Sequence, residues 1–397
     1  MLSLKNKLDP NLKALLDENT YKSIRVIIHC KKFQDRMVSR LKSYKSTVFY
    51  SITHANCISA DISSNAIRRL VEYPEVDYIT IDDFCFICAS PSNSSYPSSL
   101  RNNTSFSGKG VCIGIVDTGV YPHYDLKYPM PRIDNFVDLI NNLEYPYDDN
   151  GHGTFISGLI AGSGVSSKGE IKGIAYNSKL YVIKAFEKNG RAYASSILKA
   201  LEILINESSE HNIKIICLPF ETFFENEFLL SLFSKMFKLA ADKNIVIVLP
   251  SGSNRNTKNS IRGIAALPYS ITTSGINTHE GFKAYTYSSS GPLGKIEKPD
   301  LCGPCVDLSS LNCDIKYISQ RNNMKLYPRE LKTPYTTYTG TSCAAAYISS
   351  ILALLLEKNP DLSYKDTISI VKTSCNLLKI PKWQQGSGII DVNSLLN

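Results

Sequence analysis

The sequence predicts an α/β protein in which a large C-terminal domain with a parallel sheet follows a smaller α+β module. Beyond residue 107, continuous apolar runs alternate with segments of helical periodicity, which is typical of a parallel sheet covered on both faces. Before residue 89, shorter strands and helices follow another order, and a stretch rich in serine and asparagine separates the two regions. A chain of 397 residues is long enough for one large domain and one small one.

The N-terminal region is predicted to form a β-α-β-β-α-β module over residues 22–88, after a short helical lead-in over residues 1–21. Its strands and helices are expected at RVIIHC, FQDRMVSRLKSY, STVFYSI, ANCISADI, AIRRLVEYP and VDYITIDDFCFI, in that order. This order describes a small α+β fold of ferredoxin-like type. Residues 89–106 have little apolar periodicity and are predicted to be an exposed linker, where proteolytic nicking concentrates.

The large domain is predicted over residues 107–397, with a parallel sheet between two layers of helices. Its strands are expected at VCIGIV, KLYVIKAF, IKIICLPF and IVIVLPSG, and its helices at TFISGLIAG, ASSILKALEILINES and LLSLFSKMFKLAADK. Because parallel strands end at one edge of the sheet, residues that directly follow these strands are the first candidates for a functional site.

Composition and charge exclude several classes of partner. The net charge of +8 is spread along the chain without a dense block of lysine and arginine, so no nucleic-acid partner is expected. No apolar run reaches the length of a membrane span, and the N-terminus has no apolar signal core, so neither a membrane partner nor a secretory leader is expected. Eleven scattered cysteines fit reduced thiols, and a cytoplasmic location is expected.

Ser342 stands at the start of the most informative stretch, TGTSCAAAY. Gly340 permits a close backbone approach, and the three alanines and the apolar run that follow favour a helix, so Ser342 is predicted at a helix N-terminus. The free N–H groups of the first turn favour negative charge there, which suits a nucleophile in acyl transfer. The alternative is a serine that only caps the helix.

Asp117 and His152 stand at two further strand–helix junctions. Asp117 directly follows VCIGIV, and His152 lies in NGHGT before a helical segment, between glycines that let other segments come close. Each has a simpler alternative, a capping aspartate and a satisfied surface histidine. The chain order Asp, His, Ser in a parallel α/β domain is, however, one of the known orders of a catalytic triad.

The strings around these residues are VDTGV, NGHGT and TGTSCAA, and further matching strings are KGIAYNSKL, ALPYSITTSGIN and YSSSGPLGKIEKPDL. On these strings, residues 107–397 resemble a subtilisin-family (subtilase) serine peptidase domain. Residues 22–88 resemble the inhibitory prodomain that such enzymes carry. The resemblance implies a three-layer, parallel-sheet subtilisin-like domain, a protein or peptide substrate and no cofactor.

The resemblance also assigns roles. Ser342 would attack the scissile carbonyl, His152 would take its proton and pass it to the leaving amine, and Asp117 would hold and stabilise the imidazole. The enzyme would be made as a zymogen, with the prodomain as its own intramolecular inhibitor. The last prodomain strand, around residues 84–89, would lie in the substrate cleft like a product.

One departure from the family pattern concerns the oxyanion hole. The family supplies a side-chain donor from an asparagine just after a strand and a glycine. Here Ser253 directly follows Gly252, and Asn254 comes one residue later. Either the loop is shifted so that Asn254 donates, or Ser253 takes the role weakly. The backbone N–H of Ser342 would remain as a donor.

A second departure concerns substrate binding. Where the family has Ser-Leu-Gly at a strand end, this chain has Pro219-Phe220-Glu221. Pro219, Phe220 and Gly252 are expected to line the substrate cleft, but proline lacks an N–H, and the bulkier residues prevent primary specificity from being carried over.

Two cysteine pairs and one aspartate could instead indicate redox chemistry or a metal site. Cys302 and Cys305 form the C-G-P-C motif of thioredoxins, but they lie in KPDLCGPC rather than in a thioredoxin-like βαβ unit, so free thiols are favoured over redox chemistry. Cys85 and Cys88 form another C-x-x-C, and no Cys/His spacing supports zinc. Asp125 matches a calcium-binding position of some relatives, but the usual metal loop is not recognisable, and no metal is predicted.

We therefore predict a cytoplasmic subtilisin-like serine endopeptidase made as a zymogen. The alternative is a catalytically impaired relative that binds peptides or protein partners without cutting them, which the altered oxyanion loop and the Pro219-Phe220 strand would explain. The three triad residues favour the enzyme, because a binding module does not need them together.

Overall fold

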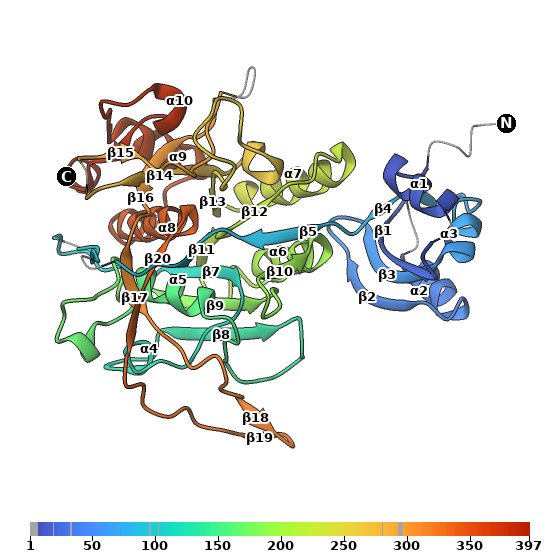
Figure 1. The fold of residues 1–397 in the computed structure, drawn as a ribbon, viewed down its shortest axis with the longest axis horizontal. Coiled ribbons are helices and arrows are strands. Elements are labelled where there is room, and N and C mark those ends of the chain that lie inside the picture. Colours follow the sequence, from blue (N-terminus) through green and yellow to red (C-terminus); the bar gives the residue numbers. More distant parts are fainter. Residues whose placement is uncertain are drawn as a thin grey trace.

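The computed structural model shows a small N-terminal module beside a large layered domain, with strand β5 (Phe84–Ile87) running from one into the other (Figure 1). It describes residues 7–18, 20–31, 34–94, 97–101, 103–279, 281–292 and 297–397. Residues 1–6 of the expected helical lead-in lie outside the described residues.

The N-terminal module has a four-stranded antiparallel sheet in the order β2-β3-β1-β4. Its elements are α1 (Pro10–Glu18), β1 (Ser23–Cys30), α2 (Gln34–Ser43), β2 (Thr47–Ile52), β3 (Cys57–Ser63), α3 (Ser64–Leu70) and β4 (Val76–Ile81). Apolar side chains of the three helices pack with Val26, Ile28 and Ile58 on one face of the sheet. On the other face, Ile27 and Cys57 belong to a core that continues into the large domain.

The segment expected as one strand over residues 76–87 is two strands with different partners. β4 ends at Ile81 within the module, whereas β5 begins at Phe84 and pairs only with strands of the large domain. The carboxylate of Asp82, between them, accepts hydrogen bonds from the backbone N–H of Ser195 (2.9 Å) and from Arg25 Nε (2.8 Å). The chain therefore leaves the module sheet where Asp82 is fixed to the large domain.

The large domain contains a ten-stranded sheet in the order β21-β22-β16-β14-β13-β11-β7-β9-β8, with β15 beside β14. Its strands are β7 (Cys112–Asp117), β8 (Ile133–Asp138), β9 (Lys179–Lys184), β11 (Ile213–Cys217), β13 (Val246–Pro250), β14 (Ile271–Asn277), β15 (Lys283–Ala284), β16 (Leu301–Pro304), β21 (Cys375–Asn376) and β22 (Ile389–Ile390). All neighbours are parallel except the pairs β14–β15 and β21–β22. The predicted parallel sheet is thus present.

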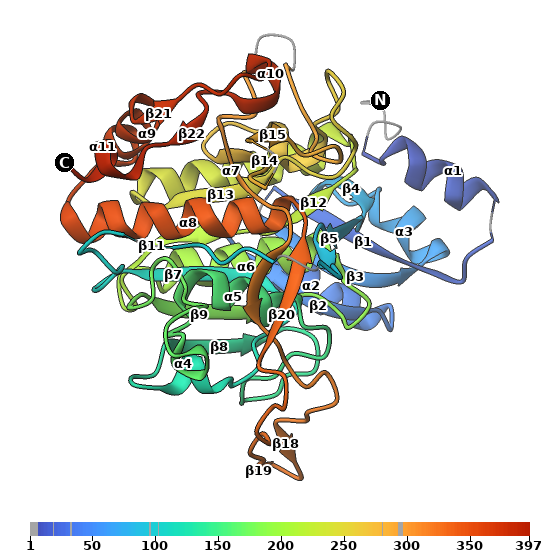
Figure 2. The ribbon, with the colours of Figure 1, turned by 60° about the vertical axis from the view of Figure 1, so that its left-hand side comes forward.

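Helices cover both faces of this sheet, as the continuous apolar strands predict (Figure 2). The helices are α4 (Tyr124–Lys127), α5 (His152–Ala161), α6 (Ala194–Asn206), α7 (Glu227–Asp242), α8 (Thr341–Lys358), α9 (Tyr364–Thr373), α10 (Lys382–Gln385) and α11 (Val392–Leu396), with 3-10 turns at Val165–Ser167 and Gly263–Ala266. Side chains of α5 and α8 fill the core on one face, and those of α6 and α7 fill the core on the other.

Contrary to the expectation that no apolar run reaches the length of a membrane span, helix α8 is long and apolar enough to cross a membrane, and among the described residues it alone passes that test. It is, however, 83% buried, with its side chains against the sheet and α5. Such burial is the pattern of a central helix in a layered domain.

Short strands outside the main sheet complete the domain. They are β6 (Ser90–Pro91), β10 (Arg191–Tyr193), β12 (Phe220–Thr222), β17 (Leu308–Leu311), β18 (Gln320–Arg321), β19 (Met324–Lys325) and β20 (Tyr335–Thr339). β6 lies in the stretch expected to be a linker, and it pairs with β20, the strand that leads to Ser342. The hairpin of β18 and β19 projects from the domain (Figure 2).

Candidate active site

Asp117 and His152 form a buried pair at the edge where the parallel strands end. Asp117 is the last residue of β7, between β9 and β11, and His152 is the first residue of α5. His152 Nδ1 lies 2.8 Å from both carboxylate oxygens of Asp117, and both side chains are fully buried. A proton on Nδ1 faces this carboxylate, so the other ring nitrogen, Nε2, is left as an acceptor.

Nε2 of His152 has no hydrogen-bond partner among the described residues. A buried acceptor without a partner is costly, so such a site usually has a functional reason. His152 Nε2 is therefore free to act as a general base toward a proton donor.

Ser342 lies in the first turn of α8, which packs against α5. Its hydroxyl donates to the carbonyl oxygen of Pro219 (2.6 Å), and its Oγ lies 3.2 Å from Cys88 Sγ. The serine hydroxyl is therefore engaged with Pro219 and makes no hydrogen bond to His152. The three predicted residues are at the expected junctions, with the Asp–His bond made and the His–Ser bond open.

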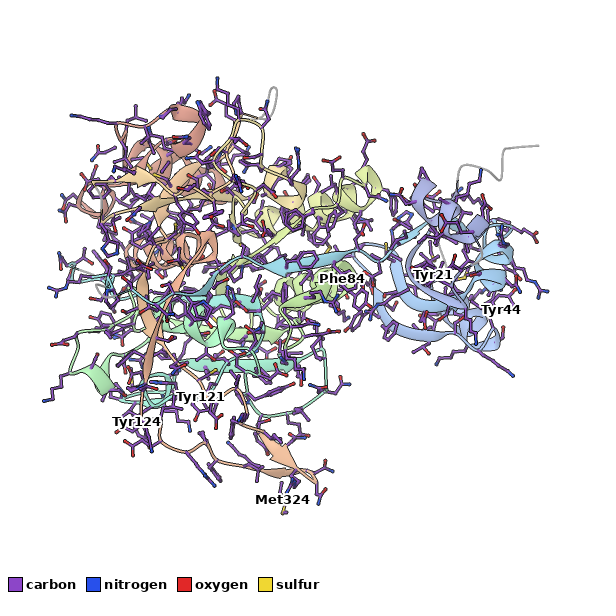
Figure 3. The ribbon with its side chains drawn as sticks, in the orientation of Figure 1. Tyr21, Tyr44, Phe84, Tyr121, Tyr124 and Met324 are labelled. Atoms are coloured by element: carbon purple, nitrogen blue, oxygen red, sulfur yellow. The ribbon has the colours of Figure 1, made fainter. Side chains whose placement is uncertain are left out.

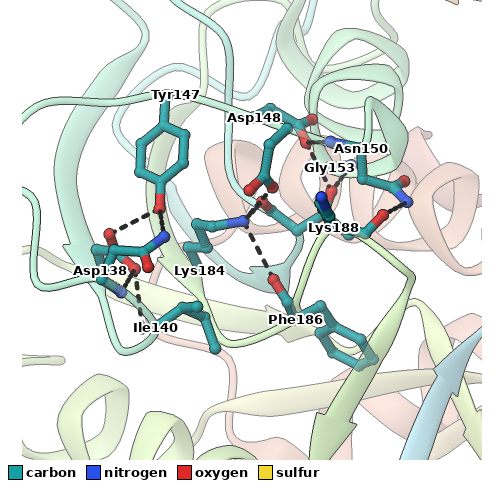
Figure 4. A network of polar contacts seen from close by, with 12 residues as sticks. Asp138, Ile140, Tyr147, Asp148, Asn150, Gly153, Lys184, Phe186 and Lys188 are labelled. Carbon is teal, nitrogen blue, oxygen red and sulfur yellow. Dashed lines mark hydrogen bonds and ion pairs between the residues drawn. The ribbon is translucent and has the colours of Figure 1, made fainter. Parts of the chain in front are cut away.

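A polar network holds the two loops that carry Asp117 and His152 (Figure 4). Its centre is the fully buried carboxylate of Asp148. This carboxylate accepts hydrogen bonds from the Thr118 hydroxyl (2.9 Å), the Gly151 N–H (2.8 Å), and both the N–H and the hydroxyl of Thr154 (2.8 and 2.7 Å). Because Thr118 follows Asp117 and Gly151 precedes His152, Asp148 fixes the two residues relative to each other.

Lys184, at the end of β9, also holds these loops through hydrogen bonds (Figure 4). Its fully buried ammonium donates to the carbonyl oxygens of Thr118 (2.6 Å) and Phe186 (3.1 Å) and to Asp149 Oδ1 (2.6 Å). A buried charge needs this degree of pairing.

The chain between the module and the large domain passes directly over Ser342. β5 is the middle strand of a three-stranded sheet, antiparallel to β10 on one side and to β12 on the other. Phe84, at its start, lies where the strand enters the large domain (Figure 3). The Ile87 N–H donates to the Gly190 carbonyl oxygen (3.1 Å), and the next residue is Cys88.

Gly340 is required where this segment crosses the site. A Cβ atom on Gly340 would lie 2.2 Å from the carbonyl oxygen of Cys88 and 2.4 Å from the Cα of Ala89. No side chain fits in that space, so the Cys88–Ala89 peptide lies against the turn that begins α8. The pairing of Ser90 with Thr339 then carries the chain away on the far side of Ser342.

The two residues expected at the oxyanion hole are both engaged elsewhere. The Ser253 hydroxyl donates to Glu221 Oε1, and the Asn254 side-chain amide donates to the carbonyl oxygen of Ser260 (3.3 Å). Neither group is offered to an oxyanion in this conformation. The side-chain hydroxyl of Thr341 is a further donor nearby, 3.3 Å from the Gly252 carbonyl oxygen.

The residues expected to line the substrate cleft have different surroundings. Pro219 lies at the serine through its carbonyl oxygen. The backbone of Phe220 pairs with Ile87, but its ring is buried against Phe186, with ring centroids 5.1 Å apart. Gly252 lies against Glu221, whose Oε2 is 3.0 Å from the position of a Cβ there.

Asp125, the position compared with calcium sites, is bound by protein groups. Its carboxylate accepts hydrogen bonds from the N–H and hydroxyl of Ser166 (2.9 and 2.6 Å) and from the Tyr335 hydroxyl (2.6 Å). Within the described residues, no group of three or more His, Cys, Asp or Glu side chains could hold a metal ion. All eleven cysteines, including Cys302 and Cys305, are free thiols, and nine of them are buried.

The roles of Glu221 and Asp148 are not predicted by the sequence, and Cys88 is expected in the cleft only through the family resemblance. Cys88 is 254 residues from Ser342 along the chain, so no local pattern connects them. Glu221 left a signal, because it replaces a family glycine while Ser253 replaces a family asparagine, and the structure joins these two residues. Asp148 is one of two adjacent aspartates before NGHGT, and nothing local distinguishes it from Asp149.

A parallel α/β domain that presents Asp, His and Ser at strand–helix junctions, in this chain order, has the organisation of a serine peptidase. Residues 108–388 match the model of the subtilase family, which is more than half of the chain. The protein therefore belongs to the subtilase family of serine peptidases and is a serine endopeptidase of the subtilisin-like class.

Individual relatives support this assignment. The chain is 27% identical to serine protease AprX of Bacillus subtilis (strain 168), over 86% of this chain and 78% of that protein. It is 23% identical to the thermostable alkaline protease of Halalkalibacterium halodurans, over 88% of this chain and 85% of that protein. It is 26% identical to subtilisin-like protease 1 of Plasmodium berghei (strain Anka), over 60% of this chain but only 38% of that longer protein.

Among solved structures, fervidolysin from Fervidobacterium pennivorans, described as a keratinolytic enzyme related to subtilisin, is similar with a TM-score of 0.71. The match covers 95% of this chain and 61% of that one, at 16% sequence identity. It shows the subtilisin-like fold.

Proposed function

We propose that this protein is a zymogen of a subtilisin-like endopeptidase, with Ser342, His152 and Asp117 as its catalytic triad. The N-terminal module is its intramolecular inhibitor. One observation carries the proposal: β5 occupies the cleft as a paired strand, and the Cys88–Ala89 peptide that follows it lies against Gly340 and Ser342. A substrate strand would lie in the same way, so Cys88–Ala89 is the bond that the enzyme cuts first.

The reaction requires one side-chain rotation. The Ser342 hydroxyl leaves the Pro219 carbonyl and turns to the unpartnered Nε2 of His152, which takes its proton as Oγ attacks the Cys88 carbonyl carbon. His152 then gives that proton to the leaving amine of Ala89, and water hydrolyses the acyl-enzyme. Asp117 stabilises the imidazolium through Nδ1.

The developing oxyanion is stabilised by backbone N–H groups at the start of α8. Without a free side-chain donor from Ser253 or Asn254, the site lacks a contribution that is worth about 10²–10³ in turnover in subtilisin itself. Slow self-cleavage is therefore expected.

The contacts of the module support an inhibitory role. Asp82 places its carboxylate at the N-terminus of α6 and accepts from both the N–H and the hydroxyl of Ser195 (2.9 and 2.6 Å). The Tyr50 hydroxyl donates to the Leu139 carbonyl (2.9 Å), and the His54 N–H donates to Glu202 (3.0 Å). These contacts hold β5 in the cleft before any cut is made.

The test is the intact mass of the refolded full-length chain over time. The unmodified chain is expected to break between Cys88 and Ala89, and the Ser342→Ala chain is expected to stay whole. Ser350→Ala is the matched control, because Ser350 lies two turns further along α8 and only donates to the Ala346 carbonyl (2.8 Å). Equal cleavage of all three chains would refute the role of Ser342.

A second candidate function is a peptide-binding relative that does not cut. The open His–Ser bond and the engaged Ser253 hydroxyl favour it. It would be supported if the unmodified chain stays whole and a fluorophosphonate probe does not label Ser342. Labelling without cleavage would instead indicate a competent enzyme that keeps its inhibitor.

We also propose a reducing, cytoplasmic location. The support is that eleven cysteines remain free thiols in one chain, which suits a compartment that keeps thiols reduced.

A further inference from the structure

Glu221 is a buried carboxylate on the cleft strand β12. In the antiparallel pairing, Glu221 is directly opposite Phe86 of β5. Directly opposite residues point to the same face, and Cys88, which directly follows β5, lies two residues beyond Phe86, so an extended chain places Glu221 and Cys88 as diagonal neighbours on that face. Only 7% of Glu221 is exposed.

The side chain of Glu221 reaches across to the loop after β13. Its Oε2 accepts the Ser253 N–H (2.7 Å), and its Oε1 accepts the Ser253 hydroxyl. Burial raises the pKa of its carboxyl group, and the two bonds from Ser253 oppose that rise. Ser253 is therefore the group that holds this carboxylate in place.

The Glu221 side chain occupies the space beside the residue that precedes the scissile bond. It bridges β12 and the loop at Gly252. The residue there is Cys88, which is small and 7% exposed. Burial and the nearby Glu221 carboxylate both raise the pKa of the Cys88 thiol, so the two side chains lie within electrostatic reach of each other.

We propose that Glu221, held by Ser253, restricts this enzyme to small, uncharged residues immediately before the cut, such as cysteine, alanine and serine. The inference rests on the proposed function and adds the specificity of the same site. A large side chain would have to displace Glu221 from Ser253 and leave a buried carboxylate without its donors, which is unfavourable. An acidic side chain would also meet like charge.

The experiment uses the full chain as its own substrate. Position 88 is varied as Cys88→Ala, Cys88→Phe and Cys88→Arg, with Glu221 retained or replaced in Glu221→Gly and Glu221→Gln. The rate of self-cleavage after refolding is followed by intact mass. With Glu221 retained, the Cys88→Ala chain is expected to be cleaved about as fast as the unmodified chain. The Cys88→Phe and Cys88→Arg chains are expected to be cleaved about 10–200-fold more slowly.

In the Cys88→Phe chain, Glu221→Gly is expected to raise the rate of self-cleavage at least about tenfold, because it opens the space beside residue 88. Glu221→Gln keeps the size of the side chain and is the matched control, so it should leave the Cys88→Phe chain slow. Circular dichroism and fluorophosphonate labelling of Ser342 check that each variant is folded. Peptides copied from residues 84–91 with the same replacements repeat the comparison in trans, should a position-88 variant not fold.

The outcomes separate the two proposals. Suppose that cleavage depends on Ser342 but is fastest in the Cys88→Arg chain, or is equally fast in the Cys88→Phe and Cys88→Ala chains. Either result overturns the role of Glu221 and leaves the proposed function standing. The same holds if Glu221→Gly does not change the preference. Absence of Ser342-dependent cleavage from every chain and peptide overturns this inference, and if a fluorophosphonate also fails to label Ser342, it overturns the proposed function as well.

Discussion

The Asp148 network can be tested by removing its central carboxylate. In Asp148→Ala, the hydroxyls of Thr118 and Thr154 can turn to other acceptors, but the backbone N–H groups of Asn150, Gly151 and Thr154 cannot. Each buried donor left without a partner costs about 1–3 kcal/mol. Removing the carboxylate also removes the cost of burying its charge, which offsets part of this loss. The free energy of unfolding should therefore fall by about 2–5 kcal/mol in total.

Asp148→Asn separates the two halves of the network. The amide keeps an acceptor for Gly151 but presents an NH₂ group to the N–H of Thr154, so about half of the loss is expected. The same variant should lower the rate at which a fluorophosphonate labels Ser342, because the loop that begins α5 and carries His152 is no longer fixed.

Stability is measured by urea-induced unfolding of chains that also carry Ser342→Ala, which prevents self-cleavage, and labelling is measured separately on chains that keep Ser342. The matched control is Asp242→Ala, since Asp242 is an exposed acid paired with Lys238 on one helix and should change stability by less than about 0.5 kcal/mol. If Asp148→Ala and Asp242→Ala unfold at the same urea concentration, the network does not hold the site in the way described.

Two further predictions concern the module and the turn at the serine. Burial and the nearby Asp9 and Asp82 raise the pKa of Asp83 to about 6, from an ordinary 3.8. The folded state therefore binds more protons than the unfolded state between these values, so the stability from Asp83 is full below pH 3.8 and is lost as pH rises through 6. The stability of Asp83→Asn relative to the unmodified chain should therefore rise by about 1–2 kcal/mol between about pH 4 and pH 7, after discounting for solvent screening. Thermal unfolding at several pH values measures this difference, and a difference that does not change with pH would contradict the prediction. Gly340→Ala should slow self-cleavage at least about tenfold, because its Cβ would displace the Cys88–Ala89 peptide; an unchanged rate by intact mass would show that this peptide does not lie there during cleavage.

Much of the large domain could be predicted because its elements have local causes. The apolar runs that form β7, β9, β11 and β13 contain few polar residues, since both faces of the sheet are buried. Ser342 could be placed at a helix start because a glycine precedes it and alanines follow it. The positions of Asp117 and His152 followed from the same reasoning about strand and helix ends.

The rest depended on contacts between distant segments. Residues 76–87 alternate like a single strand, and only the fixation of Asp82 to α6 shows why the chain leaves one sheet for another. The oxyanion role was left open between Ser253 and Asn254, but the Ser253 hydroxyl is taken by Glu221, 32 residues away, and the Asn254 amide donates to the Ser260 carbonyl oxygen. Periodicity does not report such pairs, because it describes one segment at a time.

The uninterrupted path of β5 from the module into the cleft has a consequence for how inhibition would depend on protein concentration. In the proposed zymogen, the inhibitory strand of the whole chain would be present at an effective concentration set by its short connection, which is independent of dilution. Once Cys88–Ala89 is cut, the module would be held only by non-covalent contacts, namely the pairing of β5 with β10 and β12 and bonds such as those of Asp82 and Tyr50, and its release would become a bimolecular equilibrium. The cut chain would then be inhibited at high protein concentration and active at low protein concentration, so its specific activity would depend on its own concentration.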